Sequence, residues 1–108
     1  MILIDSYGWI EYFTDGPLAD SYAPYVEKAD GESYITPTIV IYEVCRKIKN
    51  LQGERNALEA FAQISRTRIV ELTSAISLRA ADISIALKLG TTDAIILATA
   101  QENATQRL

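Results

Sequence analysis

Residues 1–12 read MILIDSYGWIEY, and this stretch decides the fold of the chain. The first four residues are apolar and too few for a helix, so they are predicted to form a strand buried on both faces, as in a parallel sheet. Trp9, Ile10 and Phe13 then recur at helical spacing. Asp5 therefore stands where a central strand gives way to a helix, which is where active sites collect in open α/β sheets. Asp also caps helices well, and this stretch alone favours the simpler capping role.

Length and composition indicate one soluble domain over residues 1–108. Hydrophobic residues make up 49% of the chain, enough for one core, and no apolar run approaches the ~20 residues of a membrane span. The start carries no basic leader, and the only cysteine, Cys45, cannot form an intrachain disulfide. We therefore expect a cytoplasmic protein without membrane contact. The absence of histidine excludes histidine-based triads, and a single cysteine excludes a multi-cysteine zinc site.

The formal charge of −4 is unevenly distributed along the chain. Acidic side chains dominate residues 1–43, whereas basic side chains dominate residues 44–68. A basic segment beside an acidic start would suit a phosphate backbone next to a metal site. Such charges more often lie on the solvated faces of helices, and we expect that use for most of them.

Apolar periodicity and breaker residues divide the chain into alternating strands and helices. Strands are predicted over residues 1–4, 33–36 and 68–72, with helices between and after them. The second helix is expected to start at Pro17, and the long third helix to have Thr36 as its N-cap and Pro37 as its first residue. Gly53 ends that helix. Thr73 or Ser74 is expected to cap a later helix, and Gly90 to end it in the left-handed conformation. The alternation predicts an α/β domain with a parallel sheet.

Each later helix is predicted to bury one apolar face. The expected inward residues are Val40, Val44, Ile48 and Leu51 in the third helix, Leu58, Phe61 and Ala62 in the fourth, and Leu78, Ala81, Ile85 and Leu89 in the fifth. The last helix starts at Thr91 and is rich in small and apolar residues, so it is expected to pack on most sides.

Three acidic residues stand out by their positions. Asp5 follows the first strand, Glu43 lies in the second turn of the long helix, and Asp93 lies in the first turn of the last helix. Taken singly, each has a simple explanation as a cap, a surface charge or a partner of the helix dipole. Both helix starts and the end of the first strand nevertheless belong at one edge of a parallel sheet. A cluster of carboxylates there would suit Mg²⁺, which binds oxygen ligands.

The chain resembles the PIN domain family in three segments. These are Ile2-Leu3-Ile4-Asp5-Ser6 with the aromatic helix behind it, Tyr34-Ile35-Thr36 with Val40-Ile41-Tyr42-Glu43-Val44, and Thr92-Asp93-Ala94-Ile95-Ile96-Leu97-Ala98-Thr99-Ala100. The last segment is the most specific. The likeness covers nearly the whole chain and is nearest to the small ribonuclease toxins of VapBC-type toxin–antitoxin pairs. It implies a PIN-like, three-layer α/β/α fold around a parallel sheet.

The resemblance also implies a function. Asp5, Glu43 and Asp93 would be the catalytic acids and the ligands of Mg²⁺ or Mn²⁺. The activity would be endonucleolytic hydrolysis of RNA by metal-activated water, and a cognate antitoxin protein would be the partner.

Polar and basic neighbours of these acids are implied to assist. Ser6 and Thr92 would orient water or substrate, unless their hydroxyls merely cap helices, which is the simpler role. Arg46, Lys47 and Lys49 follow Glu43 on the same helix and would contact the RNA backbone.

The end of the chain departs from the family pattern. Members usually continue past the last helix into a strand that ends in Thr-x-Asp, which supplies a fourth acid, and then into a fifth strand. This chain stops at Leu108, just before that point, and only three strands are predicted. The outer C-terminal strands are therefore expected to be absent, which would leave residues 2–4 at an unpaired edge. Because each unsatisfied buried backbone group costs ~1–3 kcal/mol, we expect a longer gene product or a strand from a partner chain.

Aromatic residues crowd the first two helices. Trp9, Tyr12, Phe13, Tyr22 and Tyr25 are more than one core face needs, and exposed apolar patches mark interaction sites. We therefore predict that these helices carry a homodimer or antitoxin contact. The alternative is that all five rings lie in the core.

Other functional classes fit less well or remain open. A phosphatase with an Asp nucleophile needs a second Asp two residues on, where this chain has Tyr7. A receiver-like phosphoacceptor domain needs an acid pair and a late Lys that are not evident. The remaining alternative is a non-catalytic PIN relative, or a truncated remnant, that binds a partner protein without cutting RNA.

Overall fold

Four parallel strands form one sheet in the order β3-β2-β1-β4. The computed structural model describes the backbone of residues 1–108 and every side chain except that of Gln106. The strands are β1 (Ile2–Leu3), β2 (Tyr34–Pro37), β3 (Arg68–Val70) and β4 (Gln106–Arg107). The prediction of an α/β domain with a parallel sheet is confirmed.

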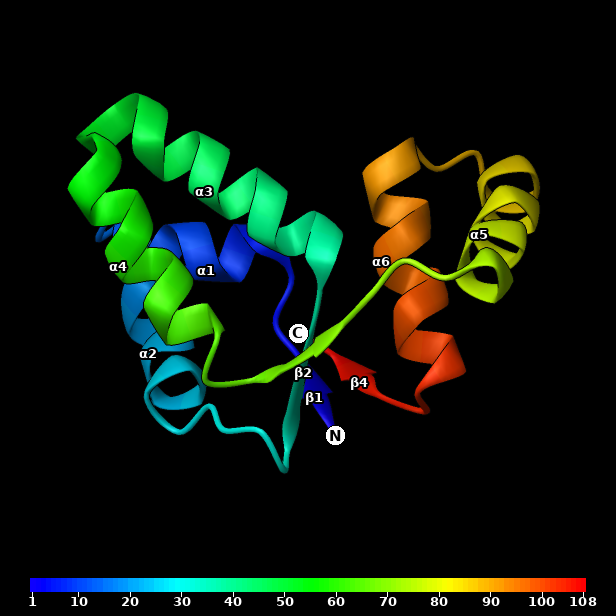
Figure 1. Ribbon diagram of the computed structural model, residues 1–108, viewed down its shortest axis with the longest axis horizontal. Coiled ribbons are helices and arrows are strands. Elements are labelled where there is room, and N and C mark those ends of the chain that lie inside the picture. Colours follow the sequence, from blue (N-terminus) through cyan, green and yellow to red (C-terminus); the bar gives the residue numbers. More distant parts are fainter.

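The helices cover the sheet on both sides. They are α1 (Ser6–Phe13), α2 (Ala19–Glu27), α3 (Thr38–Gln52), α4 (Glu54–Ile64), α5 (Ser74–Leu87) and α6 (Thr91–Glu102). Figure 1 shows α1 to α4 on one side and α5 and α6 on the other, which makes three layers. Among the described residues no single helix is long and apolar enough to span a membrane. By length and composition α5 and α6 would suffice only as a joined pair, and they are bent by 119°.

The centre of the sheet is apolar on both faces. Leu3 of β1 pairs with Ile35 of β2, and neither is more than 1% exposed. Val44 from α3 and Ile96 and Ala100 from α6 join the same core, so the two helix layers meet the sheet from opposite sides. Full burial of each large apolar side chain stabilises the fold by about 1.5–3 kcal/mol. The first strand is therefore central, as its apolar run predicts.

The prediction that the first strand lies at an unpaired edge is wrong. β4 runs parallel to β1, with Leu3 opposite Arg107. The N–H of Leu108 donates to the carbonyl of Leu3 at 2.7 Å, and the N–H of Asp5 donates to the carbonyl of Leu108 at 3.0 Å. Ala104, with a φ of 47°, turns the chain out of α6 towards this strand. A strand of two residues carries no apolar alternation, so the sequence pattern could not reveal it.

The buried faces of α4 and α5 differ from the predicted ones. The buried residues are Ala57, Ala60 and Ile64 in α4, and Ile76, Ala80 and Ile83 in α5. Leu58, Phe61, Ala62, Leu78, Ala81 and Ile85 are exposed instead, and Leu89 is half-buried. Ala80, Ala94 and Ala98 lie in one cluster between α5 and α6. Small side chains let these helices approach closely, and the larger ones on the neighbouring face are left outside.

Thr36 is a buried strand residue and not the predicted N-cap. Its hydroxyl is 2.6 Å from that of Thr67, which in turn donates to the carbonyl of Ile64 at 2.7 Å. Because the Thr67 proton is engaged there, Thr36 must be the donor to Thr67. Helix α3 accordingly begins at Thr38, with Pro37 as its N-cap.

Two other helix ends and one core position also differ from prediction. Helix α2 begins at Ala19 and not at Pro17. The left-handed residue after α5 is Lys88, with a φ of 55°, whereas Gly90 is the N-cap of α6. In α3 the first three predicted inward residues are fully buried, but Leu51, in the last turn, is 57% exposed.

The aromatic rings of α1 and α2 mostly join the core. Trp9 is 1% exposed and stacks on Phe13, with ring centroids 5.9 Å apart. Tyr12, Phe13 and Tyr22 are partly buried against the same core, whereas Tyr25 is 41% exposed. Four of the five rings therefore contribute to the core, and the predicted homodimer or antitoxin contact of these helices stays a prediction.

Candidate active site

Asp5 follows the central strand β1 and occupies the N-cap position of α1. Its side chain makes no capping hydrogen bond, so the simple capping role is wrong. The carboxylate is partly buried, with 22% of the side chain exposed. It contacts the guanidinium of Arg107 instead.

Arg107 lies between Asp5 and Asp93. Its Nη2 atom is 3.3 Å from Oδ2 of Asp5 and 3.7 Å from Oδ1 of Asp93, and its Nε donates to Oδ2 of Asp5 at 3.4 Å. Asp93 is in the first turn of α6, and 62% of its side chain is exposed. Because one nitrogen is near both acids, the two carboxylates face the same small region at the edge of the sheet.

Glu43 joins this edge through Ser6. It lies in the second turn of α3, and its Oε1 accepts a hydrogen bond from the hydroxyl of Ser6, the first residue of α1. Figure 1 shows the first turns of α1, α3 and α6 beyond the same edge of the sheet. The structure therefore places the three predicted acids at one edge: Asp5 and Asp93 around Arg107, and Glu43 beside them on the α3 side.

The carboxylate oxygens of these acids are suitable ligands for a cation, but their positions do not form a cation site. Mg²⁺ and Mn²⁺ bind carboxylate oxygens, and Mg²⁺ usually takes one or two carboxylates together with waters and substrate phosphates. In the described part of the chain, however, no three acidic or cysteine side chains come together closely enough to hold one ion. The guanidinium of Arg107 lies between two of them. The donor atoms fit a divalent cation, whereas their present arrangement fits a guanidinium.

The two predicted hydroxyl residues differ in what they do. Ser6 does not cap α1, because Asp5 holds the N-cap position; the Ser6 hydroxyl donates to Glu43. Thr92 does not cap α6, because Gly90 is its N-cap residue. Thr92 is half-buried and directly precedes Asp93 in the first turn of that helix.

A hollow of about 320 Å³ opens beside Glu43. It is lined by Ser6, Ile10, Tyr42, Glu43, Arg46 and Lys47. Arg46 and Lys47 are exposed on α3, so two cations and one acid share this recess. In proteins that bind nucleic acids, cations of this kind contact phosphate oxygens.

Lys49 is engaged elsewhere. Its Nζ atom is 2.7 Å from Oε2 of Glu54 at the start of α4, and both side chains are more than 60% exposed. The hydrogen bond to Glu54 raises the pKa of Lys49 above its ordinary value. Of the three predicted basic residues, Arg46 and Lys47 line the hollow beside Glu43, and Lys49 does not.

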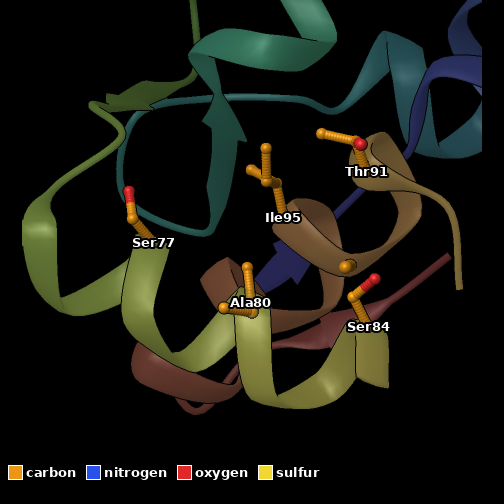
Figure 2. A pocket seen from close by; sticks show the side chains of 7 residues that line it. Ser77, Ala80, Ser84, Thr91 and Ile95 are labelled. Carbon is orange, nitrogen blue, oxygen red and sulfur yellow. The ribbon is translucent and has the colours of Figure 1, made fainter. Parts of the chain in front are cut away.

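A second hollow, of about 260 Å³, lies between α5 and α6 (Figure 2). Alanines line it together with Ser77, Ser84, Thr91 and Ile95, and none of its described lining residues is charged. The hydroxyl of Ser84 already donates to the carbonyl of Leu89 at 2.7 Å. The described residues that line this hollow therefore supply neither an acid nor a cation.

Residues 2–108 match the family model described as PIN domain. The chain belongs to the PIN domain family. The predicted resemblance is confirmed, and the parallel sheet between helix layers is the PIN fold. No curated protein matches this PIN domain.

Solved structures of toxin–antitoxin proteins are similar to this PIN domain. A toxin–antitoxin complex from Klebsiella pneumoniae is 25% identical, with a TM-score of 0.79 over 99% of this chain and 83% of that one. VapC20 of Mycobacterium tuberculosis, a toxin that cleaves the sarcin–ricin loop, is 16% identical, with a TM-score of 0.84 over 98% and 85%. VapBC2 of Rickettsia felis, bound to a promoter DNA fragment, is 16% identical, with a TM-score of 0.76 over 99% and 86%.

Sequence reasoning missed the position of Arg107. No local pattern marks residues 106–107 as a strand. Consecutive strands are usually neighbours, which would place a strand after β3 beside β3 itself. The chain instead crosses to the other side of the sheet and pairs β4 with β1, so no sequence signal pointed to an arginine beside Asp5.

Proposed function

We propose that this PIN domain is a metal-dependent endoribonuclease, the toxin of a toxin–antitoxin pair. The observation that carries the proposal is that Asp5 and Asp93 face one region, with Glu43 held at the same edge by Ser6. Membership of the PIN family supports a nuclease. The likeness to VapC20, a toxin named for cleaving the sarcin–ricin loop, supports RNA as the substrate.

The three acids would hold Mg²⁺ or Mn²⁺, as their carboxylate chemistry allows. When bound, such an ion activates a water and neutralises charge on the scissile phosphate. In this proposal Asp5, Glu43 and Asp93 are the catalytic residues. The chain has no histidine, and in this proposal carboxylates and water carry the protons.

The neighbouring side chains orient the acids and the substrate. Ser6 fixes one oxygen of Glu43, and the other oxygen would be available to the cation. Arg46 and Lys47 hold the RNA backbone at the hollow beside Glu43. Thr92 offers a hydroxyl next to Asp93 for water or substrate.

Cleavage of a labelled structured RNA tests the proposal. The wild-type chain should cut the RNA in the presence of Mg²⁺ or Mn²⁺, and cleavage should stop when EDTA removes the ion. Asp5→Asn, Glu43→Gln and Asp93→Asn should abolish cutting while the circular dichroism spectrum is retained. Asp82→Asn, at an exposed acid of α5, is the matched control and should cut like the wild type. Undiminished cutting by Asp5→Asn would assign the activity to a contaminant.

A second candidate is a non-catalytic PIN relative that only binds a partner protein. The ion pairs of Arg107 with Asp5 and Asp93 favour it, because a guanidinium is already paired with two of the three acids. The same assay separates the candidates. A folded wild-type chain that cuts no RNA at any Mg²⁺ or Mn²⁺ concentration would support the binding role.

Two partners belong to the proposal, with a cytoplasmic setting. The first is an antitoxin, since two similar solved structures are toxin–antitoxin assemblies. Co-expression with the product of the neighbouring small reading frame should yield a stable complex that inhibits RNA cleavage. The second partner is another copy of the chain. Light scattering at two concentrations should report twice the 11.9 kDa mass of the monomer.

A further inference from the structure

The side chain of Arg107 occupies the region that a cation shared by Asp5 and Asp93 would need. Its Nη2 lies within 4 Å of one oxygen from each acid, and only 30% of the side chain is exposed. The pairing of β4 with β1 sets Arg107 opposite Leu3, two residues before Asp5. The strand pairing therefore fixes the backbone of Arg107 next to the two acids.

The charge of this group is permanent. An arginine side chain keeps its proton in proteins, so it cannot leave the acids by becoming neutral. The carboxylates of Asp5 and Asp93, which both lie within 4 Å of one nitrogen of Arg107, would repel each other. The guanidinium between them offsets that repulsion. A divalent cation at the same oxygens would offset it in the same way. Both cations therefore compete for one pair of carboxylates.

The contacts of Arg107 are loose enough to be displaced. Its three nitrogen–oxygen distances run from 3.3 to 3.7 Å, longer than the ~2.7–2.9 Å of a strong charge-assisted hydrogen bond. Asp93 is largely exposed, and ion pairs at exposed sites contribute little. The guanidinium can move into solvent without breaking a backbone hydrogen bond, because the strand pairing of β4 uses the main chain.

We propose that Arg107 is an intrinsic competitor of the divalent cation, so that metal binds Asp5 and Asp93 only when the guanidinium leaves them. The inference rests on the proposed cation site, but not on RNA cleavage. It gives Arg107 a regulatory role in that site: the side chain lowers the affinity for the ion and offsets part of the negative charge of the acids until the ion arrives.

Calorimetric titration with Mn²⁺ alone tests the competition. Arg107→Gln should bind Mn²⁺ about tenfold more tightly than the wild type, because the competing charge is gone. Arg107→Lys keeps a positive charge and should stay within about threefold of the wild type. Arg79→Gln removes another ion-paired arginine, the partner of Glu102, and should leave the affinity unchanged. Adding Asp5→Asn to Arg107→Gln should abolish the tight Mn²⁺ binding, and this loss would show that the ion binds at Asp5.

A second measurement on the wild-type chain does not depend on a variant folding. The Nε–Hε NMR signal of Arg107 should shift as Mg²⁺ saturates the site, and the signal of Arg79 should not. Equal or weaker Mn²⁺ affinity in a folded Arg107→Gln, or an unmoved Arg107 signal at saturation, would overturn the inference. Absence of metal binding in both chains would overturn it too. Failure of the proposed function is a different result: no RNA cleavage, whatever the metal affinity.

Discussion

The hydroxyl of Ser6 donates a hydrogen bond to Oε1 of Glu43, 37 positions further along the chain. The bond ties the first residue of α1 to the second turn of α3. Because Ser6 directly follows Asp5, it also sets the position of one predicted acid relative to another. A small hydroxyl therefore links two parts of the candidate site that come from distant parts of the sequence.

Ser6→Ala should slow RNA cleavage without unfolding the chain. Loss of one hydrogen bond to a carboxylate lets Glu43 rotate, and a loss of ~1.4 kcal/mol corresponds to about a tenfold lower rate. Single-turnover cleavage with Mn²⁺ measures it. Ser65→Ala removes an exposed hydroxyl that donates only to a helix carbonyl, and it should cut like the wild type. Equal rates for all three chains would show that the Ser6 hydroxyl does not matter.

The double variant Arg46→Ala, Lys47→Ala should bind RNA more weakly, and its binding should depend less on salt concentration. Each contact to a single-stranded phosphate contributes ~0.7 to the slope of log affinity against log salt, so losing two lowers that slope by ~1.4. Fluorescence anisotropy with the Asp5→Asn background measures binding without cleavage. Arg55→Ala on α4, at a side chain that is 93% exposed, is the control and should keep the wild-type slope. An unchanged slope in the double variant would remove these residues from the RNA interface.

The buried pair of Thr36 and Thr67 should respond asymmetrically to loss of a hydroxyl. Thr36→Val removes only a donor and should lower the free energy of unfolding by ~0.5–1.5 kcal/mol. Thr67→Val leaves the fully buried Thr36 hydroxyl without its acceptor and should cost ~1–3 kcal/mol. Urea denaturation with a constant m-value measures both changes. The reverse ranking would mean that the hydrogen-bond direction assigned here is wrong.

Gly8→Ala should destabilise the packing of α1 against α2. A Cβ at this position would lie 2.6 Å from Cε1 of Tyr22 and 2.8 Å from Cγ2 of Ile4. Overpacking costs ~1–3 kcal/mol, and the better helix propensity of Ala returns ~1 kcal/mol, so a net loss of about 1 kcal/mol is expected. Gly31→Ala meets its nearest atom at 3.7 Å and should change stability by less than ~0.5 kcal/mol. A lower melting temperature for Gly31→Ala than for Gly8→Ala would contradict this packing.

Local patterns in the sequence determined the order of elements and the positions of the three acids. The apolar run of residues 1–4, the breaker Gly53 and the cap Thr73 act through neighbours in the chain, so their effects can be predicted without a fold. The Thr73 hydroxyl, for example, accepts from the N–H of Ile76 as an N-cap should. The placement of Asp5, Glu43 and Asp93 at one edge also follows, because parallel strands and their crossover helices leave little choice.

Only the tertiary structure decided which helix faces are buried and which cation pairs with the acids. In α5, apolar residues occupy more than one face, and close approach to α6 selected Ala80 over Ile85 for the interior. β4 forms because the backbone groups of β1 on that side need partners, although its two residues show no strand pattern. That pairing brings Arg107 to Asp5 across 102 positions of chain. Such a contact depends on non-local hydrogen bonds and charges, which no local sequence pattern encodes.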